Sequence, residues 1–491
     1  MWLSLGNINV KVSRATDAEV EWLRSKQSGL VFGNKKTLFA TGAVEQIRFF
    51  DLMDSTFPAG FLPSILKRAA ESNISVQVID ARTTTCHPMP ADLGWLRDYQ
   101  LEAVEAAIAK TRGIIKVPTG GGKTEIAIGL VKRVPAEWLF LVHRKTLMEQ
   151  AAQRYELRCP GEEAGRIGSG CWKPRERFTV ATFQTLAAAA RNKAHGPRAR
   201  LAAFLGRFTG VIVDECHVLP ADSFRAVTLG LVNAYWRIGI SGTPLDREDQ
   251  RSVYAVAALG PQIYEIPSAK LIAEGRLSMP IIRMVHVAQN FNEKDKHGLI
   301  KRWDWRKVYE EGVVRSKERN RALLSAVAQA EKPCLVFVKD LDHGHAFNNA
   351  LLKRGVKSDF VWGKASLHTR QAVVRRLERG DLEVLVCSVI FQEGVDIPEL
   401  RSVIIASAGK SVIATLQRIE RGMRRADGKT TFEVWDVADE GNPWLRRHAK
   451  ARRHAYQREG YAVSVVQVTP SVVGPSADGK QGALLFQKKG P

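Results

Sequence analysis

The chain has 491 residues, more than one hydrophobic core accommodates, so we expect about two to four domains. Its 73 lysines and arginines against 51 aspartates and glutamates give a formal net charge of +22, which predicts a polyanionic partner, nucleic acid first. No apolar run reaches membrane-spanning length and the six cysteines form no C-x-x-C pair, which argues against membrane insertion, secretion and a disulfide scaffold. We expect reduced thiols and a location in the cytoplasm of a bacterial or phage-infected cell, or on its nucleoid.

The N-terminal residues 1–88 mix two kinds of pattern. Residues 8–12 and 74–79 have the composition of strands, whereas residues 16–27 and 62–71 have helical patterns. We therefore predict a small, separate α+β domain over residues 1–88.

Short apolar runs then alternate with helical patterns, from about residue 113 to 245 and again from about residue 333 to 436. This rhythm is typical of a parallel sheet with crossover helices. Between the two series, the segment Leu271–Pro280 contains Gly275 and ends at a proline, which predicts a hinge. The predicted fold class is α/β, with two tandem parallel-sheet domains at 89–280 and 281–468 and a loosely held tail at 469–491.

A glycine-rich turn between a strand and a helix is the most informative motif. The segment Val117–Thr124 follows an apolar strand pattern and leads into helix formers. Small residues let backbone N–H groups converge on a polyphosphate at a helix N-terminus, so we predict binding of ATP with Mg²⁺ rather than an ordinary surface loop. Lys123 is expected to reach the outer phosphates and the Thr124 hydroxyl to face the metal. The predicted cradle comprises Thr119, Gly120, Gly121, Gly122, Lys123 and Thr124.

Two carboxylates follow a buried strand at residues 210–213. An open α/β sheet presents its chemistry at such strand ends, so we interpret them as catalytic rather than as an acidic turn. Asp214 is expected to hold the magnesium shell and Glu215 to polarise the attacking water. His217 is expected to sense the γ-phosphate and pass its state to the second domain.

An arginine-rich helical segment lies in the second predicted domain. Gln417, Arg421 and Arg424 fall at i, i+4 and i+7 and so share one helix face. Guanidinium groups on that face could stabilise the charge that spreads over a triphosphate during transfer. A solvated basic helix is the alternative.

In residues and in order, these motifs resemble a superfamily 2 helicase or translocase of the DExH type over residues 95–460. The resemblance implies two tandem RecA-like domains and ATP hydrolysis coupled to movement along nucleic acid. Residues 96–100 resemble the element that reads adenine, which makes Gln100 and Arg97 nucleotide contacts. Val117 replaces the first glycine of the usual cradle, and Glu420 stands where glycine is usual between the arginines.

Further strand-end motifs resemble the elements that hold a nucleic-acid backbone in this family, at residues 142–147 and 180–186. Ordinary strand-end capping is the alternative for each of them. Residues 241–244 resemble the element that couples hydrolysis to domain motion. The segment 384–398 resembles the second-domain motif, which places Gly394 and Asp396 near the ribose. The implied nucleic-acid contacts are His143, Arg144, Thr182, Gln184, Thr185, Lys339 and Ser388.

Residues 56–66 and 74–82 resemble the small N-terminal module of XPB-like and UvsW-like translocases, whose core is of the type III restriction kind. These relatives also carry a connector like that at residues 273–280. The resemblance implies that residues 1–88 bind DNA and favour branched DNA.

Two basic segments remain open to two interpretations. The segment 444–453 is either a set of phosphate contacts or a solvated helix face. Trp303 and Trp305, set among basic residues, either wedge a junction or pack against the fold.

We predict an ATP-dependent DNA helicase or translocase that acts on duplex or branched DNA in recombination, repair or replication. RNA is the alternative partner, and a membrane is not expected. The motifs would also suit a motor subunit of a restriction-type complex. A nucleotide-gated DNA-binding module without turnover is a third function class, against which Glu215 and the arginines argue. The sequence makes no prediction of oligomeric state.

Overall fold

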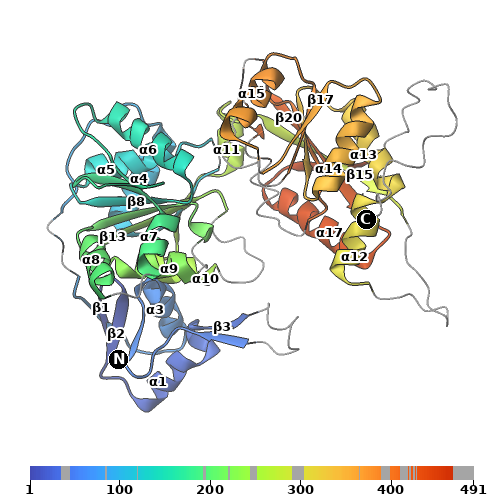
Figure 1. The fold of residues 1–491 in the computed structure, drawn as a ribbon. Coiled ribbons are helices and arrows are strands. Elements are labelled where there is room, and N and C mark those ends of the chain that lie inside the picture. Colours follow the sequence, from blue (N-terminus) through green and yellow to red (C-terminus); the bar gives the residue numbers. More distant parts are fainter. Residues whose placement is uncertain are drawn as a thin grey trace, which may run out of the picture. The chain divides into compact units, whose positions relative to one another are not determined.

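The computed structural model describes residues 1–34, 45–82, 84, 86–118, 120–191, 195–218, 222–243, 252–289, 303–363, 365–388, 397, 399–409, 419, 422–423, 426 and 428–467. The chain divides into two compact units, Met1–Ile266 and Pro267–Pro491, each an α/β structure (Figure 1).

The N-terminal part of the first unit is a small α+β structure. Its four-stranded sheet has the order β5-β2-β1-β6, with β1 antiparallel to β2 and parallel to β6. A short antiparallel pair, β3 and β4, lies outside that sheet. Its elements are β1 (Trp2–Leu5), β2 (Asn9–Ser13), α1 (Asp17–Arg24), β3 (Val31–Asn34), β4 (Glu45–Arg48), β5 (Thr56–Pro58), α3 (Leu62–Glu71) and β6 (Gln77–Asp80).

The core of this small structure continues into helix α10 (Val253–Leu259) of the large sheet domain. Val253 and Ala257 are buried in the same apolar cluster as Phe57 and Phe61. A Cβ on Gly60 would lie 1.8 Å from the carbonyl oxygen of Val256, so only glycine permits this close approach. The N-terminal structure and the large sheet therefore share one packed interface.

The large sheet of the first unit has eight strands in the order β10-β9-β11-β8-β12-β13-β7-β14. All neighbours are parallel except β9 and β10. Helices α4 to α6 cover one face and α7 to α10 the other, as Figure 1 shows. The elements are α4 (Asp98–Lys110), β7 (Arg112–Lys116), α5 (Lys123–Arg133), β8 (Trp138–Val142), α6 (Lys145–Arg158), β9 (Gly165–Gly168), β10 (Cys171–Lys173), β11 (Phe178–Thr182), α7 (Phe183–Arg191), α8 (His195–Gly206), β12 (Gly210–Asp214), α9 (Asp222–Gly230), β13 (Trp236–Ser241) and β14 (Gln262–Glu265).

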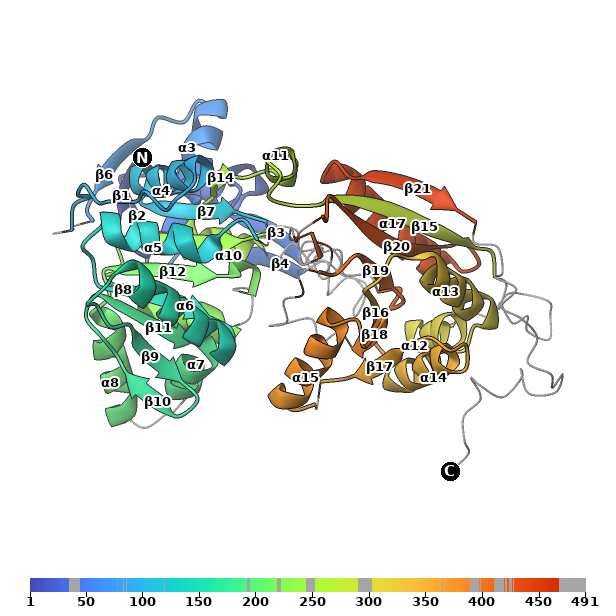
Figure 2. The same cartoon turned by 90° about the horizontal axis from the view of Figure 1, so that it is seen from above.

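The second unit carries a seven-stranded parallel sheet in the order β17-β18-β16-β19-β20-β15-β21 (Figure 2). Its buried strands read as continuous apolar runs, as expected of a parallel sheet. The two tandem parallel sheets confirm the predicted fold class. The elements are α11 (Ser268–Ala273), β15 (Met279–Val287), α12 (Trp305–Tyr309), α13 (Lys317–Gln329), β16 (Cys334–Val338), α14 (Leu341–Leu352), β17 (Ser358–Val361), α15 (Leu367–Glu378), β18 (Val384–Ser388), β19 (Ser402–Ile405), β20 (Thr431–Asp439), α17 (Pro443–Arg458) and β21 (Ala462–Val466).

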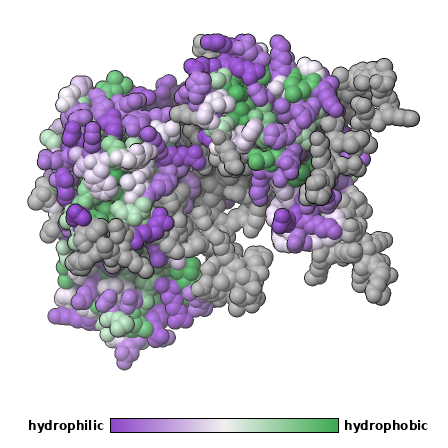
Figure 3. All heavy atoms as spheres, viewed as in Figure 1, coloured by the Kyte–Doolittle hydropathy of each residue, from purple (hydrophilic) through white to green (hydrophobic). Residues whose placement is uncertain are grey.

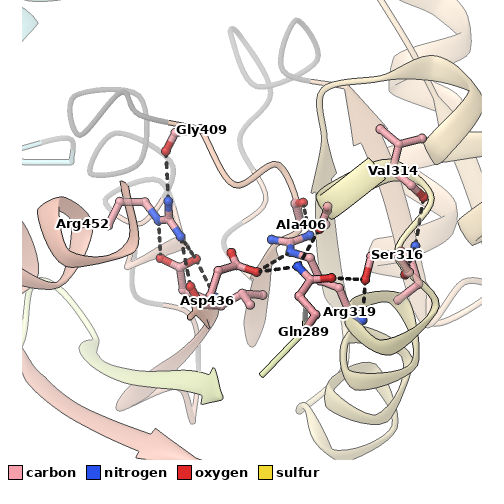
Figure 4. A network of polar contacts seen from close by, with 12 residues as sticks. Gln289, Val314, Ser316, Arg319, Ala406, Gly409, Asp436 and Arg452 are labelled. Carbon is pink, nitrogen blue, oxygen red and sulfur yellow. Dashed lines mark hydrogen bonds and ion pairs between the residues drawn. The ribbon is translucent and has the colours of Figure 1, made fainter. Parts of the chain in front are cut away.

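A buried ion pair joins α13 to the end of β20. Arg319 Nε lies 3.1 Å from Asp439 Oδ1, and its Nη1 donates to the carbonyl of Ala406 at 2.8 Å (Figure 4). The Ser316 hydroxyl accepts from the backbone N–H of Arg319 and donates to Gln289. Buried charges are retained where they are paired and hydrogen-bonded, so the network holds α13 in one position on the sheet.

A second buried pair fixes helix α17. Arg452 Nε lies 2.7 Å from Asp436 Oδ2, and its Nη1 donates to the carbonyl of Gly409 at 3.0 Å (Figure 4). Together the two arginines bind the backbone at residues 406 and 409. This backbone follows β19, so the network fixes the chain at the point where it leaves that strand.

His343 on α14 gives a testable pH dependence. It is fully buried, and burial together with Arg319 lowers the pKa of His343 to about 3. The unfolded histidine binds a proton below about pH 6.5, so the free energy of unfolding should fall as the pH falls below that value, by up to about 1.4 kcal/mol per unit. Urea unfolding at about pH 7 and about pH 5 should show a smaller difference for His343→Gln than for the wild type. If the free energy of unfolding changed equally with pH in both proteins, the pH dependence would come from other groups.

The surface and the thiols agree with the composition. Figure 3 shows hydrophilic side chains over most of the described surface in that view, with apolar residues in small patches. Within the described ranges, no helix has the length and apolar composition required to cross a bilayer. All six cysteines are free thiols, as predicted.

Candidate active site

Three strand ends meet at the carboxyl edge of the first large sheet. β12, β13 and β7 are parallel neighbours, with Asp214 opposite Ile240 and Ser241 opposite Lys116. The glycine-rich turn after β7, the Asp214–Glu215 pair after β12 and Ser241 at the end of β13 therefore lie at one edge. Open parallel sheets bind ligands at this edge.

Glycines shape the turn that follows β7. Gly120 and Gly122 have φ values of +88° and +85°, in the left-handed region that favours glycine. A Cβ on Gly122 would lie 2.1 Å from Gln100 Nε2. Helix α5 begins at Lys123, directly after this turn. Because the first N–H groups of a helix have no partner within it, the turn and the start of α5, called here the cradle, are suited to bind an anion.

Val117, which departs from the usual cradle pattern, extends the sheet. Its side chain is fully buried, and its N–H donates to the carbonyl of Ser241 at 2.9 Å. The residue therefore prolongs the pairing of β7 with β13, and the turn proper starts after it.

Lys123 and Glu215 form an ion pair, with 2.7 Å between Nζ and Oε1, and their side chains are only 14% and 18% exposed. Burial alone would raise the pKa of Glu215. The Lys123 ammonium and the hydrogen bond to His217 outweigh burial and hold the pKa of that carboxyl well below its usual range. Glu215 is therefore ionised at neutral pH.

Asp214 differs from its neighbour in protonation. Burial raises the pKa of Asp214 to about 7, and the charge of Glu215 acts in the same direction. Lys123 opposes the rise. Two adjacent, partly buried carboxyl groups therefore have pKa values that are shifted in opposite directions, which is frequent at functional sites.

Ser241 connects the end of β13 to Glu215, which follows β12. Its hydroxyl donates to Glu215 Oε2 at 3.1 Å and accepts from the backbone N–H of Thr243 at 3.2 Å. His217 Nδ1 lies 3.2 Å from the Ser241 hydroxyl and 3.3 Å from Glu215 Oε2. The sequence motif at residues 241–244 predicts coupling, but it does not predict the direct contact of Ser241 with Glu215. The Ser-Gly-Thr run at a strand end was the available signal.

The backbone of Glu215 is itself unusual. Its φ of +50° lies in the left-handed region, although it is not glycine. Such a conformation costs about 1–3 kcal/mol and is retained mainly where the surrounding structure enforces it, often at active sites. Here it turns the chain out of β12 directly at the acidic pair.

Gln100 braces the cradle. Its Nε2 donates to the carbonyl of Gly121 at 3.0 Å, and its Oε1 accepts from the N–H of Arg97 at 3.0 Å. The side chain is buried, and Arg97 Nη1 donates to the Tyr99 hydroxyl. An amide retains one more donor and one more acceptor in this arrangement, which is what recognition of an adenine edge requires.

The predicted nucleic-acid contacts of the first unit lie at and directly after the ends of two adjacent parallel strands, β8 and β11. Gln184 Nε2 donates to the carbonyl of His143 at 2.7 Å, and the Thr182 and Thr185 hydroxyls are 2.9 Å apart. Arg144 is the N-cap residue of α6. The structure thus brings the two motifs together at one edge of the sheet.

The remaining predicted residues belong mostly to the second unit. Lys339 follows β16, with its Nζ 5.3 Å from the centre of the Tyr309 ring. Ser388 ends β18, and its buried hydroxyl has no hydrogen-bond partner among the residues that the structure describes. Six predicted residues lie outside the described residues: Thr119, Gly394, Asp396, Gln417, Arg421 and Arg424.

The residues of the first unit fit a magnesium–triphosphate ligand. The glycine turn at a helix N-terminus suits phosphate oxygens, and Lys123 adds a cation. Thr124 is the second residue of α5, directly after Lys123, and Asp214 offers carboxylate oxygens of the kind that magnesium prefers.

Two protein families match this chain. Residues 94–246 match the family described as type III restriction enzyme, res subunit, and residues 318–426 match the helicase conserved C-terminal domain. The matches fall on the two large parallel sheets, and they confirm the resemblance seen in the motifs.

The names of individual proteins that are similar to this chain agree with the two family matches. The chain is 24% identical to DNA 3'-5' translocase XPB2 of Sulfurisphaera tokodaii, over 73% of this chain and 84% of that protein. It is 25% identical to the ATP-dependent DNA helicase uvsW of Enterobacteria phage T4, over 70% of this chain and 68% of that protein. Among solved structures, a fragment of a putative HsdR subunit of a type I restriction enzyme from Vibrio vulnificus YJ016 has a TM-score of 0.53 at 18% identity, covering 87% of this chain and 77% of that chain. This last likeness concerns the fold.

Proposed function

We propose that this chain, whose two large domains match superfamily 2 helicase families, is an ATP-driven DNA helicase or translocase that acts on duplex or branched DNA. Recombination, repair or replication would be its setting, in the cytoplasm or on the nucleoid. The names of its relatives, a DNA translocase and a DNA helicase, support DNA rather than RNA as the nucleic acid along which the protein moves.

One observation carries the proposal: the ionised Glu215, 2.7 Å from Lys123, stands at the carboxyl edge of a parallel sheet beside a glycine-rich cradle. A carboxylate next to a phosphate-binding lysine is suited to orient water against a terminal phosphate. Ser241 and His217 hold this carboxylate from its second oxygen.

Each residue then has a role in hydrolysis. Lys123 binds the outer phosphates, and Thr124 and Asp214 hold Mg²⁺, which neutralises charge on the phosphates when bound. Glu215 accepts the proton of the attacking water. Arg421 and Arg424 stabilise charge on the transferred group, and His217 with Ser241 reports the nucleotide state. Ser388, Lys339 and the strand-end residues of β8 and β11 bind the DNA backbone.

The function is tested by ATP hydrolysis with matched single-stranded, duplex, forked and four-way DNA and with RNA of the same sequence. We expect duplex or branched DNA to stimulate hydrolysis most. Stronger stimulation by RNA would replace the proposal with an RNA helicase. Copurification with a nuclease that is required for activity would identify a motor subunit of a restriction-type complex.

Gln100→Ala is expected to raise the KM for ATP more than that for GTP, because the remaining donor and acceptor of the amide match adenine. The structure adds a second consequence, since Gln100 also binds Gly121 of the cradle. Steady-state kinetics with both nucleotides separates the two roles. Equal increases of KM would mean that Gln100 only braces the cradle.

The N-terminal structure is proposed to contact DNA phosphates and to select branched DNA. Deleting residues 1–88 would expose the apolar face of α10, so substitutions are the better test. Lys26 and Lys67 are exposed and have no carboxylate partner within the described ranges. Changing each to alanine should reduce the salt dependence of duplex binding by about one unit of slope per lost contact. An unchanged slope and an unchanged preference for forks would place branch selection elsewhere.

A further inference from the structure

Aromatic side chains of α12 and α17 form a cluster on the second unit that the proposed hydrolysis does not use. The Trp305 ring centre lies 6.3 Å from that of Trp444, 4.5 Å from that of His448 and 5.7 Å from that of Tyr309. Figure 1 shows the two helices as neighbours within this unit. The two segments are far apart in the sequence, and only the fold brings them together.

The cluster is anchored on one side, and its most exposed ring is that of Trp444. Trp305 and Tyr309 pack against a small buried apolar core, whereas Trp444 is 36% exposed. A tryptophan held by packed neighbours presents its ring without a large cost in side-chain entropy. The anchoring core comprises Val308, Val313, Ala408 and Leu445.

Cationic groups lie over three rings of this region. Arg447 lies 4.6 Å from the centre of the Trp444 ring, and Lys307 Nζ lies 4.3 Å from that of Trp303. Lys339, already proposed as a backbone contact, has its Nζ over Tyr309. The aromatic row therefore extends from a proposed DNA contact at the end of β16 to the surface of α17.

Helix α17 carries basic side chains that no acidic side chain of the same helix neutralises. Its sixteen residues include no aspartate or glutamate. Arg446, Arg447, Lys450 and Arg453 are exposed, and no carboxylate in the described part of the chain lies within ion-pair distance of them. Like charges at helical spacing repel one another. An anionic partner on this face would remove that repulsion.

We propose that the surface formed by Trp305, Trp444, Arg447 and Lys450, called here the aromatic–basic surface, binds single-stranded DNA. A base replaces Arg447 over the exposed ring of Trp444, and the displaced Arg447 guanidinium, together with Lys450, binds the adjoining phosphates. A duplex hides the faces of its bases, so it would use the charges and not the ring. The inference rests on the proposed function, an ATP-driven helicase or translocase that acts on duplex or branched DNA.

The stacking step is tested with the full chain and two fluorescent DNAs, an oligothymidylate and a duplex of equal length. Trp444→Ala should weaken oligothymidylate binding about tenfold and leave duplex binding nearly unchanged. Trp444→Phe should retain most of the affinity, since a ring remains. Trp172→Ala is the matched control, because Trp172 on β10 is also exposed, at 46%, but lies outside the surface.

The phosphate step is tested by salt dependence. Arg447→Ala and Lys450→Ala should each reduce the slope of log affinity against log salt for the oligothymidylate by about 0.7. Arg375→Ala on α15 removes an exposed arginine outside the surface and should leave the slope unchanged.

Two results would overturn the inference. One is that Trp444→Ala binds the oligothymidylate with wild-type affinity. The other is that Trp444→Ala loses as much affinity for the duplex as for the oligothymidylate, which would show that Trp444 does not act by stacking on a base. Failure of the proposed function is distinguishable from these results. In that case, no DNA would stimulate ATP hydrolysis by the wild-type protein.

Discussion

Glu215→Gln is expected to abolish ATP turnover while ATP binding remains close to that of the wild type. Glu215 is held ionised by Lys123 and His217, and it is the group proposed to accept the proton of the attacking water. Glutamine keeps the shape and the contact with Ser241 but cannot accept that proton. A general base contributes roughly 100-fold to 10,000-fold, so kcat should fall by that range. Hydrolysis assays and binding of a fluorescent ATP analogue measure the two effects separately.

Lys123→Ala is the matched comparison, because it should weaken ATP binding itself. It also removes the partner of Glu215, so thermal stability must be measured in parallel. Near-wild-type turnover in Glu215→Gln would reject Glu215 as the base, whatever the result for Lys123.

Replacing Arg421 or Arg424 by alanine should reduce kcat by about a hundredfold or more, since arginines that stabilise transferring phosphoryl groups have effects of at least this size. Both residues lie outside the described residues, and the prediction rests on their spacing with Gln417 along a helical period. ATP binding should change much less than kcat, because the charge they stabilise develops in the transition state.

Arg375→Ala provides the control for loss of one positive charge in the same unit. If Arg421→Ala and Arg424→Ala lowered thermal stability but kept wild-type turnover per folded molecule, the arginine helix would be structural.

Features that depend on local patterns could be predicted from the amino-acid sequence. Continuous apolar runs separated by helical periods predicted two parallel sheets, because strands buried on both faces must be apolar throughout. The cradle was recognisable because positive φ values, here at Gly120 and Gly122, are adopted readily by glycine. Asp214 and Glu215 were found because a strand end places its next residues at the edge where ligands bind.

Contacts between groups far apart in the sequence could not be predicted and became visible only in the folded chain. The contact of Ser241 with Glu215 depends on β13 lying beside β12, and the left-handed backbone of Glu215 is imposed by its surroundings rather than by its residue type. Three further contacts have no local signature in the sequence. They are the close packing of Gly60 against α10, the buried ion pair of Arg319 with Asp439 and the contact between the rings of Trp444 and Trp305. Such contacts arise from packing of whole elements, whose free energy is spread over many residues, so no short pattern in the chain encodes them.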